Sequence, residues 1–177
     1  NHTKYADTIY AYNDDSLYVN LFISSKLTWK QKKITLKQQS RLPVGETVTL
    51  SFECEKPAKL SLKIRKPYWA DDMEINLNNK LQKAEAGTDS YVTLSRKFRD
   101  GDEIQLKMPH KLHTSALPDI PNRAAFLYGP TLLAAVLDEG QLPPMLVAND
   151  TDSMLGQLKQ TQPLNFTSKT IAYEPVD

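Results

Sequence analysis

Residues 47–65 read TVTLSFECEKPAKLSLKIR, and this stretch decides the fold class. Apolar and polar residues alternate strictly over residues 47–54 and again over residues 58–65. Successive side chains of a β-strand point to opposite faces, so the alternation predicts two strands that each bury one face. Pro57 lacks a backbone N–H and separates the two runs. We therefore expect two consecutive strands joined by a short turn.

The same period-two pattern extends to both sides of this stretch. The apolar residues of the further alternating runs are Leu17, Val19, Leu21, Ile23, Ile34, Leu36, Met73, Ile75, Leu77, Val92, Leu94, Ile104, Leu106 and Met108. Each run is short and is bounded by Gly, Pro, Asn or Asp, which turns favour. Many short strands with one apolar and one polar face indicate an all-β fold, namely an antiparallel β-sandwich.

Both ends of the chain depart from this pattern. Tyr5, Ile9 and Tyr10 lie at helical spacing, so we expect a short N-terminal helix over residues 3–12, or the end of a longer one. Residues 109–122 hold three prolines and are expected to be irregular. Gly129-Pro130 separates two expected buried strands, which are residues 124–128 and 131–137. Residues 145–147 are expected to add a strand, and residues 152–159 a weak helical turn.

These observations divide the chain into three parts. Residues 1–13 are expected to be the end of a barrel helix, and residues 14–140 a β-sandwich domain. Residues 141–177 are expected to form a partial second β region or a tail.

Composition and charge exclude several classes of protein. The 177 residues include 22 basic and 21 acidic ones, so no global field attracts nucleic acid or an anionic membrane. No stretch approaches the ~18 consecutive apolar residues that a membrane helix needs. We expect neither nucleic acid nor a membrane as a partner. The single cysteine, Cys54, excludes an internal disulfide and a cysteine-based zinc site made by this chain alone.

Residues that could carry chemistry have simpler structural explanations. Three carboxylate pairs resemble the two acids of a glycosidase, but each lies in a predicted turn, where Asp is favoured for backbone hydrogen bonding. They are Asp14-Asp15, Asp71-Asp72 and Asp100/Asp102. His110 and His113 follow Pro109 outside any predicted helix, and Cys54 belongs to the apolar set of its strand. We expect no catalytic, cofactor-binding or metal-ligating residue in this chain.

A basic block surrounds Trp29, and it has two interpretations. The block consists of Lys26, Lys30, Lys32, Lys33, Lys37 and Arg41, with no acidic residue between Ser16 and Gly45. Such a block with a stacking aromatic could bind nucleic acid. Lysines also protect edge strands from pairing with other chains. The balanced net charge favours edge protection.

An ordered series of segments resembles the β-L-arabinofuranosidase-type glycoside hydrolases of family 127 and its relative, family 146. The segments are Asn1-His2-Thr3-Lys4-Tyr5, residues 17–24 (LYVNLFIS), residues 62–70 (LKIRKPYWA), Asn76-Leu77-Asn78-Asn79, Gly101-Asp102 and Tyr128-Gly129-Pro130. The series covers roughly residues 1–140. Asn79 stands where the family usually has Gly, and Asn tolerates the same left-handed turn.

The resemblance implies a parent enzyme in which an α/α barrel precedes β-sandwich domains. Such enzymes cleave β-L-arabinofuranosides with retention and are thought to use a cysteine nucleophile held near zinc. The family's Cys-Cys pair would precede residue 1, and Cys54 does not match it. The nucleophile, the zinc ligands and the acid/base therefore cannot be carried onto this chain. His2 would lie nearest the active site without an assigned role, and the resemblance favours a bacterial periplasmic or extracellular location.

The sequence thus predicts the non-catalytic C-terminal β-sandwich portion of a glycoside hydrolase, inactive alone, with a structural or assembly role. Its expected partners are the barrel of the same polypeptide, a second copy of the chain in a homo-oligomer, and a plant-derived carbohydrate. Two alternatives stay open, a carbohydrate-binding module and a generic protein-interaction sandwich. In a carbohydrate-binding module, sugar contacts would fall to Trp29, Tyr68 and Tyr91, while Trp69 is expected in the core.

Overall fold

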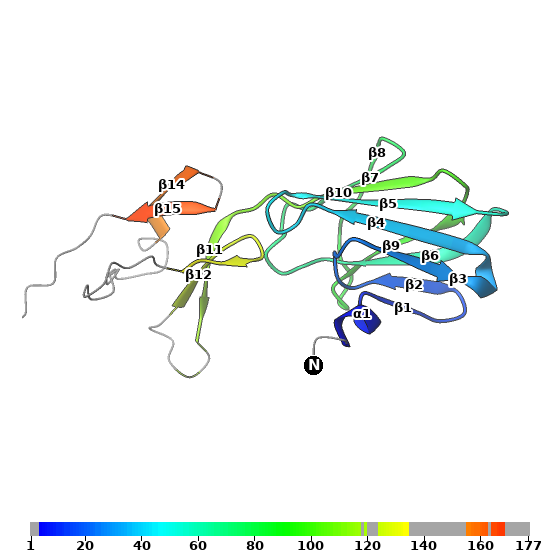
Figure 1. The fold of residues 1–177 in the computed structure, drawn as a ribbon, viewed down its shortest axis with the longest axis horizontal. Coiled ribbons are helices and arrows are strands. Elements are labelled where there is room, and N and C mark those ends of the chain that lie inside the picture. Colours follow the sequence, from blue (N-terminus) through cyan, green and yellow to red (C-terminus); the bar gives the residue numbers. More distant parts are fainter. Residues whose placement is uncertain (1–3, 118, 120–123, 135–154, 163, 169–177) are drawn as a thin grey trace, which may run out of the picture. The chain divides into compact units, whose positions relative to one another are not determined.

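The computed structural model describes residues 4–117, 119, 124–134, 155–162 and 164–168. The chain divides into two compact units, Asn1–Pro109 and His110–Asp177. The first unit contains a β-sandwich of two sheets, and the second contains two smaller sheets (Figure 1). The predicted spans 1–13, 14–140 and 141–177 stay predictions, because residues 135–154 lie outside those that the structure describes.

The sandwich pairs a four-stranded sheet with a six-stranded sheet. The four-stranded sheet has the order β1 (Tyr10–Tyr12), β2 (Ser16–Val19), β6 (Ala58–Arg65) and β9 (Tyr91–Phe98). The six-stranded sheet has the order β3 (Ser25–Trp29), β4 (Ile34–Ser40), β5 (Thr47–Cys54), β10 (Glu103–Lys107), β7 (Glu74–Leu77) and β8 (Lys80–Gln82). A 3-10 helix, η1 (Lys30–Lys32), joins β3 to β4. The predicted all-β sandwich is confirmed.

Residues 47–65 supply one strand to each sheet. Strand β5 pairs antiparallel with β4 and β10, and β6 pairs antiparallel with β9. The exception to the antiparallel prediction is the pair of β2 and β6, which run parallel. Strands β3, β4 and β5 of the other sheet separate β2 from β6 in the sequence. The long connection allows parallel pairing, whereas a tight hairpin would force the antiparallel arrangement.

The inner faces of the two sheets meet in one apolar core. Its largest fully buried side chains are Phe52, Phe98, Leu17, Ile34, Leu36, Leu50, Leu62, Ile64, Ile75, Ile104, Leu106 and Met108. Phe52 of β5 and Phe98 of β9 stack across the sheets, with ring centroids 4.4 Å apart and ring planes at 20°. Burying each large apolar side chain contributes about 1.5–3 kcal/mol. Trp69 is partly buried and packs against this core.

The N-terminal helix is present but shorter than predicted. Helix α1 covers Lys4–Thr8, and Tyr10–Tyr12 form β1 instead of continuing it. The Ile9 carbonyl accepts the N–H of Asn20 at 2.9 Å, and Tyr10 pairs with Val19. A helix of about ten residues is marginal in isolation, so pairing with the edge of β2 prevails.

A buried carboxylate ties two turns of the sandwich together. Asn78 and Asn79 connect β7 to β8 with φ of 48° and 63°, the left-handed geometry of a tight hairpin turn. Asn78 Nδ2 donates to Asp102 Oδ1 at 2.8 Å, and the Arg99 N–H donates to Asp102 Oδ2 at 2.9 Å. Arg96 Nη2 lies 3.5 Å from the same carboxylate. The β7–β8 turn is therefore fixed to the segment between β9 and β10.

The second unit corrects several expectations. Strands β11 (Leu112–Ala116), β12 (Ala124–Tyr128) and β13 (Thr131–Leu132) form one antiparallel sheet, and β14 (Leu158–Gln162) and β15 (Asn165–Ser168) form a hairpin. The expectation that residues 109–122 are irregular is wrong for β11, whose polar sequence gives no apolar alternation. The expected helical turn at residues 152–159 is wrong at Leu158 and Lys159, which begin β14. Strand β12 is only half-buried. The strand expected at residues 145–147 lies outside the described residues.

The Asp102 tie predicts an acid-sensitive contribution to stability. Burial alone would raise the pKa of Asp102, but hydrogen bonds from Asn78 and Arg99 and the charge of Arg96 hold that pKa below its ordinary value. A carboxyl with a lowered folded-state pKa stabilises the fold above its unfolded pKa, and this stabilisation is lost as pH falls through the folded pKa. We expect Asp102→Asn to lower the free energy of unfolding by about 1–3 kcal/mol at neutral pH.

Urea unfolding of the two proteins across a pH series checks this prediction. The difference between wild type and Asp102→Asn should shrink as pH falls below the ordinary carboxyl pKa of about 4. A difference that stays constant into strong acid would contradict the assigned role of the ionised carboxylate.

Candidate functional site

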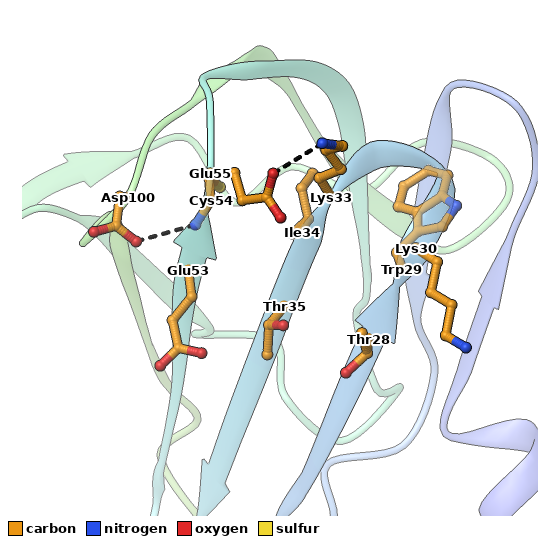
Figure 2. Close-up of a pocket in the computed structure, with 10 residues that line it drawn as sticks. All are labelled: Thr28, Trp29, Lys30, Lys33, Ile34, Thr35, Glu53, Cys54, Glu55 and Asp100. Atoms are coloured by element: carbon orange, nitrogen blue, oxygen red, sulfur yellow. Dashed lines mark hydrogen bonds and ion pairs between the residues drawn. The ribbon is translucent and has the colours of Figure 1, made fainter.

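A pocket lies where β3, β4 and β5 meet the loops at one end of the sandwich. Its volume is about 580 Å³, and its lining residues are Thr28, Trp29, Lys30, Lys33, Ile34, Thr35, Glu53, Cys54, Glu55 and Asp100. Figure 2 shows Lys33 and Glu55 reaching toward each other, with Trp29 on one side and Asp100 on the other. We call this end of the sandwich the pocket end.

The strand register explains why polar and apolar groups line the same pocket. Trp29, Ile34 and Cys54 stand side by side on β3, β4 and β5, and their side chains are buried. Thr28, Thr35 and Glu53 are the sequence neighbours of these three residues and also stand side by side on the three strands. Because successive side chains alternate between faces, this second row lies on the outer face of the sheet. The pocket therefore combines an apolar edge with hydroxyl and carboxylate groups.

The Trp29 ring is largely covered by its neighbours. The side chain is only 3% exposed, and the Tyr12 ring lies 5.3 Å from it, centroid to centroid. Lys32 Nζ lies 5.8 Å from the Trp29 ring centroid. So covered an indole offers no open ring face on which a sugar could stack.

Lysines in and near the pocket form ion pairs with neighbouring carboxylates. Lys33 Nζ lies 2.9 Å from Glu55 Oε2, and Lys37 pairs with Glu53. Lys32 Nζ lies 2.9 Å from Asp15 Oδ1. Three lysines of the basic block are therefore neutralised locally, and Lys26 lies on β3, an edge strand of its sheet. This arrangement favours edge protection over nucleic-acid binding for the basic block.

The surroundings of Cys54 favour an unreactive thiol over a nucleophile. Burial raises the pKa of the thiol, and the nearby carboxylates of Asp100 and Asp102 raise it further. The Cys54 N–H donates to Asp100 Oδ1 at 3.0 Å, which holds a carboxylate next to the residue. A nucleophilic cysteine needs a base or a positive charge that lowers its pKa. The surroundings of Cys54 act in the opposite direction.

The structure separates the three predicted sugar-contacting residues. Trp29 lies at the pocket end, whereas Tyr68 and Tyr91 lie near the opposite end, where β6 ends and β9 begins. Tyr68 is 73% exposed. Tyr91 is half-buried, donates its hydroxyl to Asn20 Oδ1 at 2.6 Å and packs edge-on against Tyr18. These three residues do not form one surface, and their contact with sugars stays a prediction.

The histidines and carboxylates of the described residues do not assemble a metal centre. His113 Nε2 lies 3.0 Å from the Gly129 carbonyl, and the His110 ring packs edge-on against Tyr128. In the part of the chain that the structure describes, no three His, Cys, Asp or Glu side chains are close enough to hold a metal ion. The residues present therefore do not fit the zinc site that the family resemblance implies for the parent enzyme.

Sequence reasoning missed the residues that line the pocket beside Trp29. Thr28 and Thr35 carry no motif, Glu53 is a polar position of its strand, and the sequence favours a turn role for Asp100 over a place in a glycosidase-like carboxylate pair. Strand register brings these residues together, and a single sequence does not specify which strands are neighbours. No signal in the sequence could have found this cluster.

Fold and site together define the chain as a β-sandwich domain without a catalytic constellation among its described residues. Residues 16–110 match the family described as β-L-arabinofuranosidase, GH127 middle domain. The match covers more than half of the 177 residues. The chain therefore belongs to the GH127 family, and its residues 16–110 correspond to the middle domain. The predicted C-terminal position is refined accordingly, since the matched domain is a middle one.

Solved structures share this fold. Ara127N, a GH127 β-L-arabinofuranosidase from Geobacillus stearothermophilus T6, is 21% identical with a TM-score of 0.65, covering 72% of this chain and 21% of that one. The GH127 β-arabinofuranosidase BT3674 is 22% identical with a TM-score of 0.61, covering 70% of this chain and 23% of that one. A third structure, a glycoside hydrolase, is 22% identical with a TM-score of 0.60, covering 70% of this chain and 22% of that one. The chain spans about a fifth of the length of these proteins.

A search of curated proteins and a search of the described residues for membrane-spanning helices both found nothing. No curated protein matches the chain. Among the described residues, no helix is both long and apolar enough to cross a bilayer.

The placement of Cys54 predicts slow alkylation. A thiol with a raised pKa is largely protonated at neutral pH, and the thiolate is the reactive form. We expect iodoacetamide to modify Cys54 at least about tenfold more slowly in the folded chain than in the urea-unfolded chain at the same pH. Mass spectrometry of timed samples measures both rates. Equal rates in the two states would show that Cys54 is accessible and ordinary in its pKa.

Proposed function

We propose that this chain is the non-catalytic sandwich of a larger glycoside hydrolase acting on β-L-arabinofuranosides, and that it docks on the preceding domain of that polypeptide. The family supports this proposal, because a middle domain has other domains of the same polypeptide beside it. We infer the position of the docking surface from the contrast between the two ends of the sandwich.

The chain enters and leaves the sandwich at the end opposite the pocket end. Helix α1 lies there, because Asn20, which directly follows β2, bonds the carbonyls of Thr8 and Ile9. The chain also leaves the first unit there, since β10 ends at Lys107 and the unit ends at Pro109. We call this the linker end, and it consists of α1, the loops at residues 20–24, 41–46 and 66–73, and residues 108–109 (Figure 1).

Exposed apolar side chains gather at the linker end. They are Tyr5 of α1, Ile23 and Val44 of the loops, and Tyr68, which is the most exposed of the four. Val44 is 70% exposed, and no described residue of the sandwich covers it. Exposed apolar groups that form one contiguous patch are typical of interaction surfaces. Among the described residues, the pocket end presents one exposed large apolar side chain, Tyr12, beside the charged residues Lys30, Lys33, Glu55 and Asp100.

The preceding domain is the occupant that this geometry favours. The related structures are several times longer than this chain, so most of such a polypeptide lies outside it. A domain connected through α1 is tethered to the linker end, and tethering raises its effective concentration there. The resemblance identifies that domain as an α/α barrel. The proposal assigns the nucleophile, the acid/base and the zinc to the barrel and leaves this chain a supporting role, in a bacterial protein of the periplasm or the cell exterior.

Matched substitutions of exposed apolar residues test the docking surface. Tyr68→Ser and Val44→Ser should each weaken association with the separately produced preceding segment about tenfold, because each removes an apolar anchor. Leu81→Ser is the control, since Leu81 is also 70% exposed but lies on β8, at the edge of the six-stranded sheet. Titration calorimetry measures the affinities. All three variants should keep the free energy of unfolding within about 0.5 kcal/mol of wild type.

Equal loss of affinity in the Leu81→Ser control would contradict the assignment of the docking surface to the linker end. Association of two copies of this chain, abolished by the same linker-end variants, would replace the preceding domain by a homodimer as the occupant.

The non-catalytic role predicts an inactive chain. We expect no hydrolysis of p-nitrophenyl β-L-arabinofuranoside by the purified chain, with or without added zinc, because the described residues offer no activated nucleophile. The Cys54→Ser variant is the control for background release of p-nitrophenol. Zinc-dependent turnover that disappears in Cys54→Ser would refute the proposal.

A further inference from the structure

Two lysines stand directly opposite each other on the outer face of the four-stranded sheet. Lys59 of β6 pairs in register with Lys97 of β9, and both residues are exposed. Leu60 and Phe98, next to them on the two strands, point into the core, so the lysines point away from it. Like charges directly opposite on one face of a sheet repel each other and destabilise it.

No carboxylate among the described residues compensates this pair. Among the described residues, neither Lys59 nor Lys97 has an ion-pair partner. The neighbouring cations are different, since Lys32 pairs with Asp15, and Arg96 lies 3.5 Å from Asp102. Lys59 and Lys97 therefore leave two positive charges uncompensated at one place on the sheet.

A hollow adjoins Lys59. Its volume is about 420 Å³, within the range of about 300–1,000 Å³ typical of small-molecule sites. Its lining residues are Asp15, Lys32, Lys59, Leu60, Ser61, Ser95 and Arg96. Three cations and one carboxylate line the hollow, and because Lys32 pairs with Asp15 and Arg96 lies near Asp102, Lys59 supplies its uncompensated positive charge.

Two hydroxyl groups lie beside the lysines. Ser61 and Ser95 are the next register pair on the outer face, and their Oγ atoms are 2.8 Å apart. One hydroxyl donates to the other in this contact, which leaves the hydrogen of the acceptor hydroxyl free to donate elsewhere. The lining of the hollow therefore includes Lys59 and one free hydroxyl donor, and Lys97 lies opposite Lys59 on the same face of the sheet.

We propose that this surface, defined by Lys59, Lys97, Ser61 and Ser95, binds the carboxylate of a uronate residue in a polysaccharide. A carboxylate presents two oxygens, one for each ammonium group, and charge-assisted hydrogen bonds of this kind are the stronger ones. That the anion belongs to a polysaccharide rests on the proposed function, because a glycoside hydrolase domain works next to glycans. The site lies on the sheet face and does not use the linker end.

Edge protection is the competing explanation for the same lysines. Strand β9 is the edge of its sheet, and lysines on an edge strand discourage pairing with other chains. If edge protection is correct, replacing Lys59 or Lys97 should lower the solubility of the chain. Edge protection gives no role to the pair of Ser61 and Ser95 or to the hollow. Ligand binding and solubility can be measured separately on the same variants.

Titration of the isotope-labelled 177-residue chain, followed by amide NMR, tests the proposal with three ligands. Tetragalacturonate should shift the amides of residues 59–61 and 95–97 saturably, and added salt should weaken the binding. The methyl ester of the same tetrasaccharide, which has no charge, should not shift them. Sodium sulfate should bind at least about tenfold more weakly than tetragalacturonate, because it lacks the sugar contacts.

Charge variants connect the binding to the two lysines. Lys59→Gln and Lys97→Gln should each weaken tetragalacturonate binding about fivefold, and Lys80→Gln, an exposed lysine on β8, should leave it unchanged. Lys97→Glu should abolish the binding and raise the melting temperature, because an opposite charge then faces Lys59.

Several outcomes would overturn the proposal. They are the absence of saturable shifts, equal shifts with the methyl ester, equal affinity for sulfate, and equal weakening by Lys80→Gln. Aggregation of Lys97→Gln with unchanged affinity would establish edge protection instead. These readouts are independent of the docking test, so a failure of the uronate site leaves the linker-end surface standing.

Discussion

The apolar contact between the inner faces of the two sheets is the constraint on which the rest of the structure depends. Phe52 and Phe98 stack across it, and the strict alternation of β5 and β6 gives each sheet one face that must be buried. Each sheet has only one apolar face, so its other face and the loops at both ends are free to carry charge. The linker end and the pair of Lys59 and Lys97 lie on these remaining surfaces.

The sequence predicts this core well and the surfaces poorly. Strands β5, β6 and β10 are recognisable because their period-two pattern is strict and turn residues bound them. Tyr10–Tyr12 were expected to be helical, because their spacing suits a helix and only the nearby edge of β2 makes them a strand. Strand β11 was missed, because three prolines and a polar sequence hide it.

The pairing of Lys59 with Lys97 illustrates the same limit for the candidate sites. The two residues are 38 positions apart by their numbers, and only the register of β6 with β9 places them opposite each other. The pocket row of Thr28, Thr35 and Glu53 likewise depends on pairing among β3, β4 and β5. Cys54 is the contrasting case: its place in an apolar alternation already indicated a buried, inert thiol, and its surroundings agree.

The two ends of the sandwich suggest how such a domain serves a larger enzyme. The linker end combines both chain connections with exposed Tyr68 and Val44, whereas the pocket end is mainly charged, with Tyr12 as its one exposed large apolar side chain among the described residues. Hydrogen exchange, compared between this chain alone and the longer polypeptide, tests this division most directly. The account predicts that residues 20–24, 41–46 and 66–73 gain protection in the longer polypeptide, while residues 30–33, 55–57 and 99–102 do not. Protection gained at the pocket end, with the linker end unchanged, would contradict it.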